Sequence, residues 1–391
     1  MFKRNLSDIM GTQTQLHTHP TWIEFNRTAL RRNVALIRKR IGSGVIIIAS
    51  VKANAYGHGI VPSAKTLQEE GVEMLATGSF SDAIAMRKAG IEIPILMLAG
   101  TLPAGMGELI SAKLIPTVYD LEGANAANTA ASSYKGNQGV PIFIKVDCGM
   151  GRLGVNLENA VDLIQKIQKM ENIWIQGIYT HLSFKDEEGM NFSKERFSIF
   201  YELLDTLEEN GCHIPITQAL ASSALAMGWS DRCTAVCPGH LLYGLPSLEP
   251  TLATLEEFVP VCKSVKSRVI HVGEHGQGPK PGAGGYHKAR RYSRTAVIPF
   301  GLHDGNRAHK LGKNSKILFK NRRLAILGVS LEHLVFEVHD DISIEVGDEV
   351  TIIGRESSEK IDMAEYATWQ DSSPLEALLA LSNRLPIIVA D

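Results

Sequence analysis

The sequence predicts an α/β fold, a (β/α)8 TIM-type barrel, followed by a C-terminal mostly-β domain. Up to about residue 227, short apolar runs alternate with amphipathic helical segments, and about eight such units fit a closed parallel barrel. Beyond about residue 260 the pattern changes to strands without long helices. The length of 391 residues also exceeds one ordinary core. We therefore expect an extension over residues 1–20, the barrel over 21–258 and the β domain over 259–391.

The expected barrel elements follow from hydrophobic periodicity. A short alternating strand at residues 22–25 precedes a helix at 27–40. The β-branched run at 45–48 has no polar alternation, which is typical of a strand buried on both faces. Further strands are expected at residues 74–77, 93–98, 115–118, 141–146, 173–179 and 216–219, and further helices at 60–70, 81–88, 121–131, 157–170, 193–209 and 223–227.

The C-terminal part is expected to contain several strands and two short helices. The strands are predicted at residues 265–272, 295–300, 324–329, 334–338 and 349–353, and the helices at 363–369 and 374–381. An open doubly wound sheet is the alternative for the first part of the chain. That fold needs a glycine-rich nucleotide turn after its first strand, and none occurs near the N-terminus.

Composition excludes some classes of partner. The formal net charge is −2 and the basic residues are spread along the chain, so we expect no nucleic acid partner. No apolar run reaches membrane-spanning length and no leader pattern opens the chain, so we expect a cytoplasmic protein without a membrane partner. The 5 cysteines show no paired spacing and are expected to be free thiols. Cys233 and Cys237 lack a second ligand pair, so no metal site is expected.

Polar residues stand just past several of the apolar runs. In a barrel, the chemistry gathers at the carboxyl ends of the strands. Lys52 is notable there, because a lysine held partly out of water loses its proton more easily and can attack a carbonyl to form a Schiff base. The residues at such positions are Lys52, Asp147, His181, Ser222 and Cys237.

The segment at residues 51–59, Val-Lys-Ala-Asn-Ala-Tyr-Gly-His-Gly, resembles the pyridoxal phosphate lysine motif of the alanine racemase family. Segments 145–154, 179–181 and 242–245 are similar to further motifs of that family. The resemblance extends from Trp22 to the end of the chain. It implies a pyridoxal phosphate-dependent isomerase that interconverts L- and D-amino acids at Cα. It also implies a homodimer, in which the β domain of one subunit completes the site of the other.

The resemblance also implies roles for individual residues. Lys52 would hold the cofactor and act as a base, and Arg152 would contact the cofactor's phenolic oxygen and the substrate carboxylate. Lys145 matches a position that is often carbamylated and that then buttresses the arginine. His181 would pack against the pyridine ring. The other implied cofactor contacts are Tyr56, Ser222, Ser223, Tyr243 and the backbone amides of Gly239 and His240.

The chain departs from the family at the cofactor site. Cys237 stands where an arginine faces the pyridine nitrogen, so we expect the cofactor to be a freer electron sink. Ser222 and Ser223 stand where the family has Asn-Ser, and both hydroxyls can donate.

The larger departures are expected in the β domain. Counting back from Ile298-Pro-Phe-Gly places Ala283 where the family has the tyrosine that acts on the opposite face of Cα. Tyr286 is the candidate replacement. Leu331 lies in the segment that matches the substrate-carboxylate signature, and Leu302 and Leu375 replace tyrosines. Two alternatives therefore stay open: a one-base enzyme, such as an aldolase, decarboxylase or aminotransferase, and a pyridoxal phosphate-binding protein without catalysis.

Overall fold

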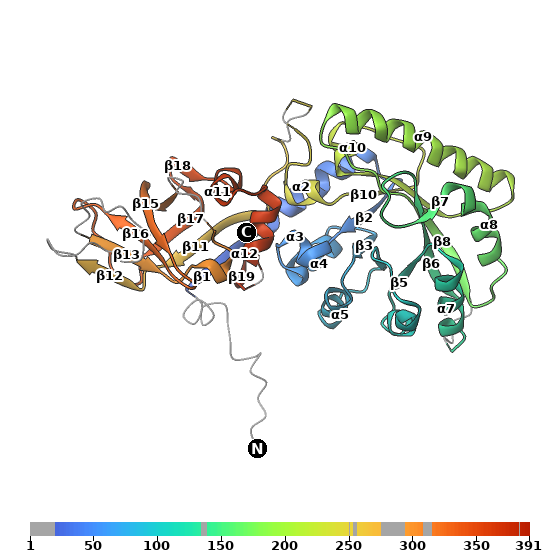
Figure 1. The fold of residues 1–391 in the computed structure, drawn as a ribbon, viewed down its shortest axis with the longest axis horizontal. Coiled ribbons are helices and arrows are strands. Elements are labelled where there is room, and N and C mark those ends of the chain that lie inside the picture. The colour runs from blue at the N-terminus through green and yellow to red at the C-terminus, as the bar shows by residue number, and fades with distance from the viewer. Residues whose placement is uncertain are drawn as a thin grey trace, which may run out of the picture. The chain divides into compact units, whose positions relative to one another are not determined.

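The structure of the protein is a computed structural model. It describes residues 20–133, 139–249, 251–252, 256–274, 294–307, 315–382 and 384–391. The chain divides into two compact units (Figure 1). The barrel unit comprises Thr28–Tyr56 and Ile60–Pro260, and the β unit comprises Met1–Arg27, Gly57–Gly59 and Val261–Asp391.

The strands of the barrel unit form a closed parallel sheet, which confirms the predicted fold class. The sheet closes where β10 pairs with β2, with Ala235 opposite Ile46 and Val236 opposite Ile47. A short strand, β7 (Val155–Asn156), pairs outside the ring with β6. The strands of the ring in the described part of the chain are β2 (Ile46–Ser50), β3 (Met74–Thr77), β4 (Ile95–Met97), β5 (Ile115–Val118), β6 (Val140–Asp147), β8 (Ile173–Tyr179), β9 (Ile216–Ala221) and β10 (Ala235–Cys237).

Helices alternate with these strands and lie outside them (Figure 1). Side chains that accept hydrogen bonds from backbone N–H groups define several helix starts, such as Asp186 at the start of α9, which accepts from Gly189 at 2.9 Å. This cap explains why α9 begins before residue 193, where periodicity alone placed it. The helices are α2 (Arg27–Ile41), α4 (Ile60–Glu69), α5 (Phe80–Lys88), α6 (Met106–Ser111), α7 (Leu121–Ala131), α8 (Leu157–Ile167), α9 (Glu187–Glu209) and α10 (Ser222–Ala226).

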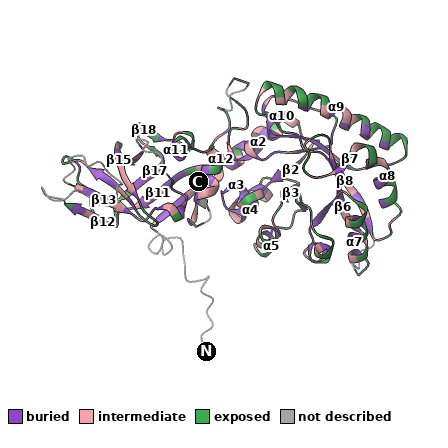
Figure 2. Ribbon diagram, in the orientation of Figure 1, coloured by how far each residue is buried: buried purple, intermediate pink, exposed green. Residues whose placement is uncertain are grey.

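The interior of the barrel is packed with side chains. Figure 2 shows the strands of the ring as largely buried. Gly177 on β8 leaves room for the ring of Phe143 on β6, since a Cβ atom at Gly177 would lie 2.3 Å from that ring. The packed cluster comprises Ile48, Met74, Ala76, Leu96, Ile115, Phe143, Tyr179, Ile216 and Ala235. This filled interior leaves the carboxyl ends of the strands as the place for a site.

The β unit is mostly β, as predicted, and its strands form one mixed sheet. Its strand order is β12-β13-β16-β15-β14-β17-β11-β1-β19, and β18 pairs with β17. The strands are β1 (Thr21–Asn26), β11 (Cys262–Arg268), β12 (His271–Glu274), β13 (Arg294–Ile298), β14 (Lys316–Phe319), β15 (Arg322–Val329), β16 (Leu334–Val338), β17 (Glu349–Glu356), β18 (Glu359–Ile361) and β19 (Ile387–Ala390). Two helices, α11 (Met363–Gln370) and α12 (Pro374–Ser382), match the expected short helices.

The placement of β1 differs from the expected boundary at residue 21. β1 pairs antiparallel with β11 and parallel with β19, so residues 21–26 belong to the β unit and not to the barrel. A short alternating strand fits either sheet, and its partners, which lie more than 230 positions away, cannot be read from local pattern. None of the helices in the described ranges is both long and apolar enough to cross a bilayer.

Candidate active site

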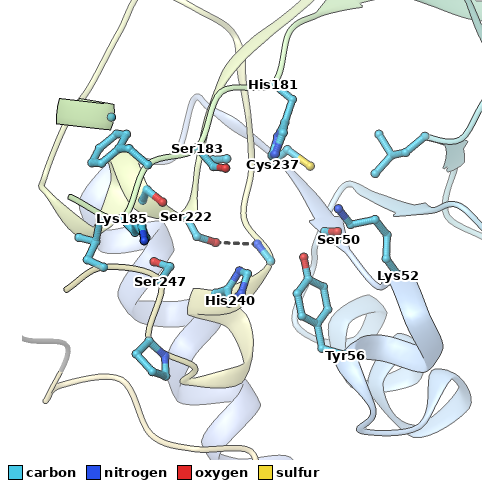
Figure 3. A pocket seen from close by; sticks show the side chains of 18 of the residues that line it. Ser50, Lys52, Tyr56, His181, Ser183, Lys185, Ser222, Cys237, His240 and Ser247 are labelled. Atoms are coloured by element: carbon cyan, nitrogen blue, oxygen red, sulfur yellow. Dashed lines mark hydrogen bonds between the residues drawn. The ribbon is translucent and has the colours of Figure 1, made fainter. Parts of the chain in front are cut away.

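A cavity of about 880 Å³ opens at the carboxyl ends of the barrel strands (Figure 3). All of its lining residues belong to the barrel unit. Predicted site residues from five different strand ends converge on it. These are Lys52, Tyr56, Lys145, Arg152, His181, Ser222, Ser223, Cys237, Gly239 and His240.

Lys52 follows β2 and begins a left-handed turn, α3 (Lys52–Tyr56). The φ angles of Ala53, Asn54 and Ala55 are 51°, 55° and 55°, in the region that costs L-residues about 1–2 kcal/mol each. The Asn54 side chain stabilises the turn, because its Oδ1 accepts the N–H of Ile60 at 2.7 Å. The turn directs both Lys52 and Tyr56 to the cavity. Sequence reasoning missed this conformation, since four consecutive non-glycine residues rarely adopt it.

The Ser222 side chain accepts hydrogen bonds from two backbone N–H groups at one end of the cavity. Its Oγ accepts the N–H of Gly239 at 2.8 Å and that of Leu241 at 3.4 Å. The hydroxyl proton of Ser222 stays available to an anion, because both protein bonds use the oxygen as acceptor. A Cβ atom at Gly239 would lie 2.1 Å from the Tyr56 hydroxyl, so only glycine leaves room for that hydroxyl. This end of the cavity can therefore bind oxyanions.

Two rings hold the Tyr56 side chain in place. The Tyr56 ring stacks on Tyr243 at a centroid distance of 5.0 Å and meets the edge of His240 at 5.4 Å. The hydroxyl of Tyr243 donates to the backbone oxygen of Ser50 at 3.2 Å. Tyr243 is fully buried, is not among the lining residues of the cavity and supports the ring of Tyr56, and the cofactor contact that the resemblance implies for it stays a prediction.

Arg152 and Lys145 also line the cavity and bring positive charge to it. The Asp147 carboxylate accepts the backbone N–H of Gly149 at 2.9 Å and that of Arg152 at 3.1 Å, which shapes the turn after β6. Lys145 is only 6% exposed, and its Nζ lies 4.4 Å from the centroid of the Tyr179 ring. Burial, together with the charge of Arg152, lowers the pKa of Lys145 to about 8. Near physiological pH the amine of Lys145 is therefore still mostly protonated, but a minor fraction of roughly one fifth is neutral.

His181 and Cys237 are neutral polar groups in the cavity (Figure 3). Burial, and then the charge of Lys52, lowers the pKa of His181 to about 3. Burial raises the pKa of the Cys237 thiol to about 11, although the charges of Lys52 and Lys145 oppose the shift. At neutral pH the two groups therefore contribute no charge, and the cations of the cavity are left to attract anionic ligands.

Sequence reasoning missed several lining residues. Ser50, Tyr179 and Gln218 lie on the barrel strands, where inward-facing positions near the carboxyl ends give a usable signal. Lys185 and Ser247 come from loops and carry no such signal.

The predicted residues of the β unit are not among the lining residues of the barrel cavity or fall outside the described part of the chain. Tyr286 and Ala283 fall outside the described residues. Leu331 lies between β15 and β16 of the β unit, where its side chain is 72% exposed. Leu302 begins a short 3-10 turn, η4 (Leu302–Asp304), that is held by the Asp304 carboxylate accepting the Gly301 N–H at 2.8 Å.

Both parts of the chain match models of known protein families. Residues 25–247 match the N-terminal domain of alanine racemase, and residues 262–389 match its C-terminal domain. The chain is 33% identical to an alanine racemase of Halothermothrix orenii, covering 94% of this chain and 96% of that protein. It is also 33% identical to one of Methanococcus maripaludis, over 95% of this chain and 99% of that protein.

Solved structures agree with the sequence relatives. An alanine racemase structure from Clostridium difficile 630 superposes with a TM-score of 0.85 at 29% identity, covering 95% of this chain and 96% of the other. The structure from E. faecalis gives a TM-score of 0.85 at 26% identity, covering 95% and 99%. These matches confirm the resemblance seen in the motifs: the chain belongs to the alanine racemase family.

Proposed function

We propose that this protein is a pyridoxal phosphate-dependent enzyme that interconverts the L and D forms of an amino acid at Cα. One observation carries the proposal. Lys52 lines the same cavity as the oxyanion-binding end at Ser222 and Gly239 and the cation Arg152. A lysine, an anion site and a carboxylate partner in one cavity are the set of groups that pyridoxal phosphate and an amino acid require.

The residues present fit the cofactor. The cavity of about 880 Å³ is of the size that binds small molecules. The absence of a Cβ at Gly239 leaves the Tyr56 hydroxyl against the backbone, next to the Ser222 hydroxyl. Tyr56, Ser222, Ser223 and the amides of Gly239 and His240 would hold the phosphate. When bound, pyridoxal phosphate supplies an electron sink that makes a bond at Cα easier to break.

Lys52 is the proposed covalent partner and the base on one face of the substrate. Its amine would take the proton from Cα and return it there, which requires a fixed approach to that carbon. The left-handed turn after Lys52 supports this role, because the Asn54 bond to Ile60 limits movement of the turn. Arg152 would pair with the substrate carboxylate, for which its planar fork is suited.

Lys145 is the proposed carbamate. Its neutral amine is the form that adds to carbon dioxide, and a pKa of about 8 makes that form accessible. A carbamate would place a negative charge beside the guanidinium of Arg152, whose charge is one of the causes that lower the pKa of the unmodified amine. The modification would thus turn a repulsion into an ion pair.

The neutral groups would set the electronics of the ring. His181 would pack on it as an uncharged imidazole, since its pKa is about 3. Cys237 would face the pyridine nitrogen as a thiol, since its pKa is about 11. Neither group forces a charge on that nitrogen, which is consistent with a freer electron sink than an arginine would allow.

The proposal also needs a base on the face of the substrate Cα opposite Lys52, and two candidate arrangements stand for it. Tyr286 is the proposed donor, contributed with Leu331 by the β unit of a second subunit in a homodimer. A one-base reaction is the second candidate, because Ala283 stands where a tyrosine would serve that face. Aldol cleavage, decarboxylation and transamination need only the base that Lys52 supplies.

The deciding experiment uses the protein loaded with pyridoxal phosphate in deuterated water. A panel of L- and D-amino acids is supplied, and Cα exchange, chirality and new products are followed together. Exchange with inversion is the expected result. Exchange with retained chirality would indicate a single base, and release of an aldehyde or amine would indicate a lyase.

Two controls complete this test. Lys52→Ala should lose the visible absorbance of lysine-bound cofactor, and its persistence would contradict the assignment of Lys52. Cofactor binding without exchange from any substrate would indicate a binding protein without catalysis.

A further inference from the structure

The anion end of the cavity continues past Ser222 into a lobe formed by two loops. One loop follows β8 and carries Ser183 and Lys185, and the other follows η3 (His240–Tyr243) and carries Ser247. Figure 3 shows Lys185, Ser247 and Ser222 on the same side of the cavity. The roles given above to the site residues use neither Lys185 nor Ser247.

The Lys185 backbone is fixed from both sides. Phe184 is buried and packs on Trp229 with a centroid distance of 5.1 Å. Asp186 caps α9 by accepting the N–H of Gly189 at 2.9 Å. Between them, the backbone oxygen of Lys185 accepts the N–H of Glu249 at 2.8 Å, which joins the two loops. The loop therefore holds Lys185 at the edge of the cavity with little freedom of its main chain.

Two polar groups of this lobe are free to form a hydrogen bond or an ion pair with a ligand. The Oγ of Ser247 is inaccessible to solvent and has no hydrogen-bond partner among the described residues. A buried hydroxyl without a partner has lost the hydrogen bond that water would supply, and a ligand oxygen would restore it. Within the same part of the chain, Lys185 forms no ion pair with either nearby acid, Asp186 or Glu249.

We propose that Lys185 and Ser247 form an outer phosphate subsite, which binds the phosphate oxygens that face away from Ser222 and Gly239. This inference rests on the proposed binding of pyridoxal phosphate. Ser222, Ser223 and the amides approach the phosphate from the strand ends, whereas Lys185 and Ser247 approach it from the loops. The ammonium group of Lys185 supplies a full positive charge to the dianion, and the Ser247 hydroxyl donates one neutral hydrogen bond.

The test separates the phosphate from the rest of the cofactor. The full-length protein is freed of cofactor and titrated with pyridoxal phosphate and, separately, with pyridoxal, which lacks the phosphate. Binding is followed by tryptophan fluorescence and visible absorbance. The proteins compared are wild type, Lys185→Gln, Lys185→Arg, Ser247→Ala and the control Lys169→Gln, which removes the same charge from an exposed site near the end of α8.

We expect Lys185→Gln to raise the Kd for pyridoxal phosphate about three- to tenfold and to leave the Kd for pyridoxal unchanged. Lys185→Arg should restore most of the affinity, and Ser247→Ala should show a smaller loss with the same ligand dependence. The difference between wild type and Lys185→Gln should shrink at high salt. Lys169→Gln should match wild type.

Other results would overturn the inference. Equal losses for both ligands would place Lys185 away from the phosphate, and unchanged affinity in both Lys185→Gln and Ser247→Ala would remove the subsite altogether. Wild-type protein that binds no pyridoxal phosphate would refute the proposed function as well. The failure of the subsite alone is therefore distinguishable from the failure of cofactor binding.

Discussion

The Oγ atom of Ser222 lies 2.8 Å from the backbone nitrogen of Gly239, and this hydrogen bond joins the ends of two neighbouring barrel strands, β9 and β10. The bond fixes an amide donor and a hydroxyl at one point of the cavity. Tyr56 reaches the same point from β2, the strand on the other side of β10. Three consecutive strands of the ring thus define the position of an anion, which makes that position sensitive to single atoms.

Gly239→Ala is expected to disrupt this arrangement. The added Cβ atom would lie 2.1 Å from the Tyr56 hydroxyl, so Tyr56 must move and the anion site opens. We expect at least a tenfold rise in the Kd for pyridoxal phosphate, or about 1.4 kcal/mol, in absorbance titrations. Gly107→Ala, where a Cβ meets nothing within 4 Å, is the control, and similar losses in both would contradict the prediction.

Ala53→Gly tests the left-handed turn. The φ of Ala53 is 51°, so glycine removes steric strain there, and this gain offsets the entropy that glycine loses on folding. We expect the free energy of unfolding to stay constant or to rise by up to about 1 kcal/mol. Ala126→Gly, in the right-handed helix α7, should lower it by about 1 kcal/mol. Denaturant unfolding compares the two, and equal losses would argue against the left-handed turn.

The barrel could be predicted from sequence because each of its units repeats a local pattern. The runs at residues 74–77, 115–118 and 173–179 match β3, β5 and β8 at both ends. β10 was missed because it has only three residues, Ala235–Cys237, and one of its two partners, β2, lies far away in the chain. Likewise, residues 265–272 were predicted as one strand, whereas the structure breaks them into β11 and β12, which pair with different strands.

The candidate site could be predicted where a residue follows a strand directly. Lys52 and His181 were identified in this way, Cys237 was identified as the polar end of an apolar run although β10 itself was not expected, and all three line the cavity. Position alone did not reveal that Tyr243 supports Tyr56 from behind, because that depends on ring packing between distant segments. The positions of loop residues such as Lys185 depend on tertiary contacts, here the hydrogen bond from the Glu249 N–H to the Lys185 backbone oxygen. Hydrophobic periodicity in the sequence does not predict such contacts.

Alkylation of Cys237 should be slow in the folded protein. Burial raises the pKa of its thiol from 9.0 to about 11, and only the thiolate reacts. Two pKa units correspond to about a hundredfold fewer thiolates at pH 8. We expect the rate of modification by iodoacetamide, followed by mass spectrometry of the peptide, to fall by about that factor relative to unfolded protein and to rise steadily towards pH 11. A rate that levels off below pH 9 would show that the thiol is not shifted in this direction.

His181 should make the stability of the cofactor-free protein depend on pH. Its pKa is about 3 in the folded state, against 6.5 for an unperturbed histidine, so between these values the unfolded chain binds a proton that the folded chain does not. The free energy of unfolding therefore falls as the pH drops through this window, by about 1.4 kcal/mol per pH unit for this group. At pH 5 the loss attributable to His181 is about 2 kcal/mol, while above pH 6.5 it vanishes.

His181→Asn isolates this contribution, because asparagine cannot take up the proton and every other titrating group is kept. Denaturant unfolding of both proteins at several pH values between 5 and 7.5 gives two curves of stability against pH. We expect the wild-type curve to be steeper below pH 6.5 and the two curves to run parallel above it. Parallel curves over the whole range would mean that the folded protein accepts the proton on His181. The His181 ring would then have to be better hydrated, and the cations Lys52, Lys145 and Arg152 farther from it, than the structure shows.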